Sequence, residues 1–200
     1  MAGVKLADLK PPVADPRGRV WVKAPVFPFA RLGIDPVLGP EMRSTGEVLG
    51  SGPSLGLALV KALRAAGIRL DEHGAVFLSL NDRDKSRAGA QELVTRLKEL
   101  ALPVYATSGT ATFLAAHGIA AKRLDKIGEG GRNAVAMLRH HKVGLVLNTP
   151  RGVKGRTDAA AIRLAALASG VPCLTTLEGA LAALEGIKAL RGCELDVRPL

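Results

Sequence analysis

Short apolar runs alternate with amphipathic segments from residue 74 onward, and this alternation constrains the fold more than any other feature of the chain. The apolar runs predicted as strands are residues 75–80, 103–106, 143–147 and 171–175. Residues 123–126, Arg-Leu-Asp-Lys, contain a single apolar residue and are predicted as a weak third strand. Between and after them, apolar residues recur every three or four positions, as in helices with one buried face. The helices predicted in this way are residues 86–100, 110–117, 133–140, 158–168 and 177–190. This pattern is typical of a parallel sheet covered by helices on both faces. We therefore predict a three-layer α/β/α domain with a five-stranded parallel sheet over residues 73–200.

The first 72 residues have a different texture and form the other predicted part of the chain. They are rich in proline and glycine. Proline removes a backbone donor and interrupts regular pairing. We therefore expect an irregular segment, with short extended pieces at residues 20–22 and 26–27 and one helix at 54–66. Its large apolar residues are expected to be partly exposed or buried in a dimer; they are Trp21, Phe27, Phe29 and Leu38.

Polar residues follow each predicted strand. In an open parallel sheet, ligands bind beyond the carboxyl ends of the strands. Residues 107–110, Thr-Ser-Gly-Thr, open a predicted helix, whose free N–H groups and dipole favour an anion. The residues Lys85 and Lys126 follow neighbouring strands, and the Asn148 amide can both donate and accept. A helix cap and solvated lysines are the ordinary roles of such residues, but their coincidence at successive strand ends favours a phosphate site.

Composition narrows the partners. The chain has 200 residues and a formal charge of +10, which favours anionic partners. Aromatic residues make up only 3% and the basic residues are dispersed, so we do not expect nucleic-acid binding. No run approaches the roughly 18–20 apolar residues of a membrane span. Two cysteines, Cys173 and Cys193, provide neither a disulfide framework nor a four-ligand zinc site, which indicates the cytoplasm. The histidines show no metal-ligand spacing, and no catalytic constellation is evident.

Two stretches carry a resemblance to a known family. Residues 26–29, Val-Phe-Pro-Phe, and residues 33–48 resemble the tail of the carbamoyl-phosphate unit in the large chain of carbamoyl phosphate synthase. The segment from residue 74 to 190 resembles the methylglyoxal-synthase-like domain that follows it. The stretches that carry this second resemblance are residues 79–85, 106–110, Lys126 with 129–130, 147–150, 162–163 and 175–177. Together they cover nearly all of the chain.

The resemblance implies a regulatory portion that binds a nucleotide monophosphate such as UMP or IMP. Lys85, Thr107, Thr110 and Lys126 would surround the phosphate, with Asn148 and Thr149 near the nucleoside. The strand order would be flavodoxin-like or close to it. ATP and Mg²⁺ or Mn²⁺ would be held by ATP-grasp units upstream, so this chain would contain no cofactor and no catalytic residue. Partners would be the remainder of the large chain, the glutamine amidotransferase small chain and, in a homo-oligomer, further copies.

Some positions depart from the family pattern. Arg132 is displaced by one position from the family's Glu-Gly-Arg-Pro motif. Ala24 and Cys173 stand where ornithine-responsive members carry Glu and Tyr, while Thr175 remains as a possible residue of a second effector site. Two other interpretations stay open. The first is a stand-alone methylglyoxal-synthase-like lyase, for which Glu129 is the acid within the glycine-rich residues 128–131. The second is an assembly module that binds no nucleotide.

Overall fold

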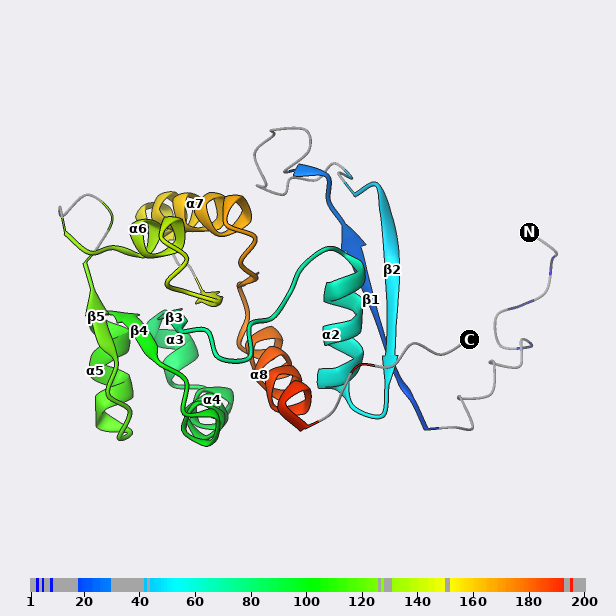
Figure 1. Cartoon of the computed structure of the whole chain (residues 1–200), viewed down its shortest axis with the longest axis horizontal. Helices are drawn as coiled ribbons and strands as arrows, with labels where there is room; N and C mark the ends of the chain where they lie inside the picture. Colours follow the sequence, from blue (N-terminus) through cyan, green and yellow to red (C-terminus); the bar gives the residue numbers. More distant parts are fainter. Residues whose placement is uncertain are drawn as a thin grey trace.

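The computed structural model describes residues 18–29, 44–125, 131–149 and 152–192, together with isolated positions at 3, 5, 8, 42, 127 and 195. Within 152–157 only the helical backbone is described. Figure 1 shows a central sheet with helices on either side, and a long hairpin with a helix against it at the other end of the molecule. In the described part of the chain, no helix combines the length and hydropathy of a membrane span.

The sheet contains five parallel strands, as expected. They are β3 (Val76–Ser79), β4 (Val104–Thr107), β5 (Lys122–Leu124), β6 (Leu145–Asn148) and β7 (Cys173–Leu174). Their spatial order is β5-β4-β3-β6-β7, and the central strand β3 pairs Val76 with both Val104 and Leu145. Numbered along the chain this order is 3-2-1-4-5. It differs from the flavodoxin order 2-1-3-4-5 in that the third strand lies at the edge beside the second, but both orders follow the rule that ligands bind where the strand order reverses. That point lies between β3 and β6.

Helices cover both faces of this sheet and form the expected three layers (Figure 1). The helices α4 (Ala88–Leu100), α5 (Ser108–Ala116) and α8 (Leu177–Gly192) lie on one face. The helices α6 (Ala134–Arg139) and α7 (Gly152–Ala168) lie on the other. Strand side chains alternate between the two layers: Val76 and Leu78 are in the cluster with α4 and α8, whereas Phe77 is in the cluster with α6 and α7. Both faces are therefore apolar, which explains the uninterrupted apolar runs in the sequence.

The N-terminal segment is more regular than expected. Strand β1 (Val20–Val26) pairs antiparallel with β2 (Gly46–Gly52) along its whole length. In a two-stranded sheet both strands are edge strands, where a proline is tolerated although it lacks a backbone donor. Pro25 is accordingly found in β1, and its side chain is exposed. Trp21 is 37% exposed and Phe27 is half-buried, as expected, whereas Phe29 is buried. Leu38 lies outside the described residues.

Helix α2 (Leu55–Ala65) joins the hairpin to the main domain, and it matches the helix expected at 54–66. Ser54 caps it, accepting a hydrogen bond from the Leu57 amide. The helix packs between the hairpin and α8, and Val60 belongs to the same apolar cluster as the α8 residues Leu184 and Ile187. The predicted division of the chain at residue 72 stays a prediction, although side chains from both sides of it share this cluster.

Candidate functional site

A cavity of about 510 Å³ lies at the carboxyl ends of β3, β4 and β6. Pockets for small ligands typically measure roughly 300–1,000 Å³. Its walls combine apolar side chains from the sheet and α7, such as Phe77 and Ile162, with a larger polar set. The polar or glycine residues that line it are Ser79, Asn81, Asp82, Thr107, Ser108, Gly109, Asp125, Asn148, Thr149 and Asp158. The cavity therefore occupies the position between β3 and β6 where the strand order reverses.

The N-terminus of α5 forms one wall. Thr107 is the N-cap residue, but its side chain makes no capping hydrogen bond to the helix. Ser108 and Gly109 follow at the cavity surface. The first-turn N–H groups and the positive end of the helix dipole therefore face the cavity without a side-chain acceptor, which is a favourable arrangement for an anion.

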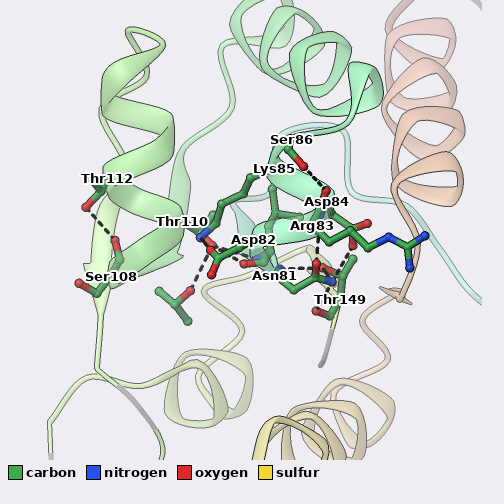
Figure 2. Close-up of polar contacts among 12 residues, drawn as sticks. Asn81, Asp82, Arg83, Asp84, Lys85, Ser86, Ser108, Thr110, Thr112 and Thr149 are labelled. Carbon is green, nitrogen blue, oxygen red and sulfur yellow. Dashed lines mark hydrogen bonds and ion pairs between the residues drawn. The ribbon is translucent and has the colours of Figure 1, made fainter. Parts of the chain in front are cut away.

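Lys85 adds a positive charge at the same place. It lies at the end of α3 (Asp82–Lys85), a single turn that Asn81 caps by accepting from the Asp84 amide. Lys85 Nζ lies 3.3 Å from the point where a Cβ would stand on Gly109. It also donates to Asp82 Oδ1 at 2.7 Å (Figure 2). Two of the predicted site elements, Lys85 and the helix opened by residues 107–110, are thus adjacent.

Thr110 makes buried hydrogen bonds that link the end of β3 to α5. Its side chain is buried, and its hydroxyl accepts a hydrogen bond from the Leu80 amide at 2.9 Å. Thr107 Oγ1 donates to the same hydroxyl at 3.3 Å. The Thr110 hydroxyl therefore ties the end of β3 to α5 and positions the helix N-terminus, whereas the cavity wall is formed by its neighbours Ser108 and Gly109.

Replacing Thr110 with valine tests this bracing role. Valine has nearly the same shape but leaves the buried Leu80 amide without its acceptor, so we expect a loss of about 1–2 kcal/mol in the free energy of unfolding. Denaturant unfolding measures it. Thr112→Val on the exposed face of the same helix is the matched control, because among the described residues the Thr112 hydroxyl bonds only to the Ser108 carbonyl within the helix. Equal stability of the two variants would contradict the bracing role.

Asn148 and Thr149 end β6 at the opposite wall, and both are buried. Thr149 Oγ1 accepts from the Asn81 amide at 3.1 Å and from Asn81 Nδ2 at 3.2 Å, so this hydroxyl is committed within the protein (Figure 2). The Asn148 side chain is only 4% exposed and lines the cavity, and in the described part of the chain its amide makes no hydrogen bond. A buried amide without a partner is costly. Asn148 is therefore the polar group that a ligand would satisfy.

The remaining predicted residues are separate or not described. Lys126 lies outside the described residues, as do residues 128–130, which include Glu129. Thr175 is exposed after β7 and does not line the cavity, and Ala24 is buried in β1. Burial raises the pKa of the Cys173 thiol to about 11, so it stays protonated at neutral pH and is no nucleophile.

Three carboxylates in the cavity wall were not anticipated as site residues. Asp82 belongs to α3, Asp125 directly follows β5, and Asp158 lies within α7. The helix predicted to begin at Asp158 begins at Gly152 instead, so Asp158 lies inside α7, where it lines the cavity. Position after a strand was the available signal for Asp82 and Asp125. No group of His, Cys, Asp or Glu among the described residues is arranged to hold a metal ion.

Comparison with known proteins agrees with this architecture. A family model described as MGS-like domain matches residues 89–175. The carbamoyl phosphate synthase large chain of Rubrobacter xylanophilus is 49% identical over 195 residues, covering 96% of this chain and 18% of that protein. The C-terminal section of the large chain of Aquifex aeolicus is 46% identical over 171 residues, or 85% of this chain and 32% of that protein. The large chain of Archaeoglobus fulgidus is 42% identical over 201 residues, or 100% of this chain and 19% of that protein.

The sheet, its covering helices and the family match define the second part of the chain as an MGS-like domain. With the matched relatives, the chain as a whole corresponds to the C-terminal, MGS-like part of the carbamoyl phosphate synthase large chain. It spans less than a third of the length of the relatives compared above.

Proposed function

We propose that this chain is the regulatory portion of a glutamine-hydrolysing carbamoyl phosphate synthase, and that its cavity binds a nucleotide monophosphate of the UMP or IMP class. Binding would tune ATP-dependent synthesis of carbamoyl phosphate for the pyrimidine and arginine pathways in the cytoplasm. The remainder of the large chain would carry out catalysis with ATP and Mg²⁺ or Mn²⁺. The glutamine amidotransferase small chain would supply ammonia from glutamine.

One observation carries the proposal: three groups suited to a phosphorylated ligand meet at one cavity. The α5 N-terminus has no side-chain cap, Lys85 Nζ stands beside Gly109, and the buried Asn148 amide has no partner in the described part of the chain. The helix N-terminus and the lysine favour an anion. The amide can pair with a phosphate oxygen, a ribose hydroxyl or a base edge. The cavity volume is sufficient for a nucleotide.

Calorimetric titration with UMP and with IMP tests the proposal. Lys85→Gln should weaken binding about 10-fold, because it removes a charged hydrogen-bond partner of the phosphate. Lys188→Gln is the matched control. Lys188 lies on α8 and pairs with Glu99 of α4 at 2.7 Å, and we expect its replacement to leave nucleotide affinity unchanged. Lys126→Ala tests the second lysine expected from the sequence, with a similar loss. Absence of any nucleotide binding by the parent chain would overturn the proposed function, and equal binding by Lys85→Gln would place the site elsewhere.

A further inference from the structure

The described charged residues that line the cavity are acidic, although the chain as a whole is basic. The protein carries a formal charge of +10, yet the described residues that line the cavity include no lysine or arginine. They include the carboxylates Asp82 on α3, Asp125 directly after β5, and Asp158 on α7. Positive potential enters this space from the α5 N-terminus and from Lys85 beside it. The cavity therefore has one positive corner and otherwise acidic polar walls.

Lys85 already forms an ion pair within the protein. Its Nζ donates to Asp82 Oδ1 at 2.7 Å, and the lysine side chain is 17% exposed. Figure 2 shows the Asp82 carboxylate turned toward the Lys85 amine. Because Asp82 lines the cavity as well, a phosphate that reaches Lys85 must share or replace this carboxylate. Asp82 thus opposes every negative charge that enters the positive corner.

Ligand charge decides how large this opposition is. A terminal phosphate carries about −1.5 to −2 at pH 7. Its attraction to Lys85 and to the α5 N-terminus can offset the repulsion from Asp82. The additional phosphates of a triphosphate bring further negative charge toward the carboxylates of the described walls, Asp82, Asp125 and Asp158. Coulombic repulsion therefore grows with each phosphate beyond the first.

From this arrangement we infer that Asp82 is a specificity-determining residue, which lowers affinity for all phosphorylated ligands and lowers it most for polyphosphates. The cavity consequently selects a nucleoside monophosphate over the corresponding triphosphate. This inference rests on the proposed nucleotide site and adds to it the group that reads ligand charge. Asp82 is a counter-ion of Lys85, and its removal raises the positive potential that the ligand meets at this corner.

The test compares UMP with UTP in a Mg²⁺-free buffer of low ionic strength, because metal ions and salt screen phosphate charge. Calorimetric titrations are made with the parent chain, Asp82→Asn and Glu99→Gln. Asparagine keeps the shape and removes the charge. Glu99→Gln removes an equal charge from an ion pair of the same 2.7 Å length at the far end of α4, roughly 15 Å along the helix. A thermal melt verifies that each variant is folded.

We expect the parent to bind UMP more tightly than UTP. Asp82→Asn should tighten UMP binding roughly 3-fold and UTP binding roughly 10-fold, a modest scale because the Asp82 carboxylate is exposed to solvent. Glu99→Gln should change neither affinity. If the parent binds UMP but Asp82→Asn leaves the UMP-to-UTP ratio unchanged, the specificity role is overturned and the proposed function stands. If the parent binds UTP as tightly as UMP, the selectivity is overturned. If it binds neither, the proposed function falls and this inference with it.

Discussion

Replacing Gly50 with alanine should lower the free energy of unfolding by about 2–3 kcal/mol, the upper range for overpacking a close contact. A Cβ on this residue of β2 would stand 2.1 Å from the Ala58 carbonyl oxygen and 2.5 Å from the Ala62 amide nitrogen. Both atoms belong to the backbone of α2, which cannot yield as a flexible side chain can. The hairpin would have to move away from the helix. Denaturant unfolding followed by circular dichroism measures the loss.

Gly46→Ala is the matched control for this change. Gly46 begins the same strand, and an added Cβ there meets nothing within 4 Å. Its stability should stay within about 0.5 kcal/mol of the parent, as for surface substitutions generally. Similar losses in both variants would mean that a strand preference, rather than contact with α2, determines the effect, and the close packing of hairpin and helix would be contradicted.

This contact is one of a series that joins the N-terminal segment to the MGS-like domain. Gly56 of α2 lies against Gly186 of α8, where an added Cβ on Gly56 would stand 2.6 Å from the Gly186 amide nitrogen. Glycine at both positions lets the two helix backbones approach closely. Val60 then reaches the apolar cluster under the sheet. The hairpin, α2 and α8 are therefore packed as successive layers.

The sheet was predictable because its signal is local. The buried central strands are short apolar runs, such as Val76–Ser79 and Leu145–Asn148, and helices follow them along the chain. The β1–β2 hairpin was not predictable in the same way. Gly50 and Gly52 weaken the strand pattern, and the reason for Gly50 is the α2 backbone against it, which no local pattern reveals. Proline in β1 gave a further signal against pairing.

The site was predictable in part for a similar reason. Strand-end positions pointed to Lys85, residues 107–110 and Asn148, and the structure brings all three to one cavity or its rim. The bracing role of Thr110 depends on the Leu80 amide, which directly follows β3, so the local sequence around residue 110 does not reveal it. The acidic wall was missed because Asp125 and Asp158 meet only through the fold. Lys126 remains a prediction from the sequence.

Replacing Asn148 with leucine should separate stability from binding. In the parent, the Asn148 amide is buried and unpaired among the described residues, a cost that an apolar side chain of similar size removes. We expect the variant to gain about 1 kcal/mol of unfolding free energy. We also expect UMP binding to weaken about 30- to 100-fold, because a polar group of the ligand would then face leucine without a partner.

Asn81→Leu is the matched comparison, since Asn81 lines the same cavity but is fully engaged. It caps α3 through the Asp84 amide and donates to the Thr149 carbonyl and hydroxyl. This substitution should cost about 1–2 kcal/mol of stability, as the loss of a helix cap and of buried partners does. Thermal melts of the two variants should therefore show stability changes of opposite sign, and UMP titrations measure the affinity of each. If Asn148→Leu were less stable than the parent and bound UMP equally well, its amide would be a structural group with an internal partner, and the cavity would lose the residue that most directly marks it as a ligand site.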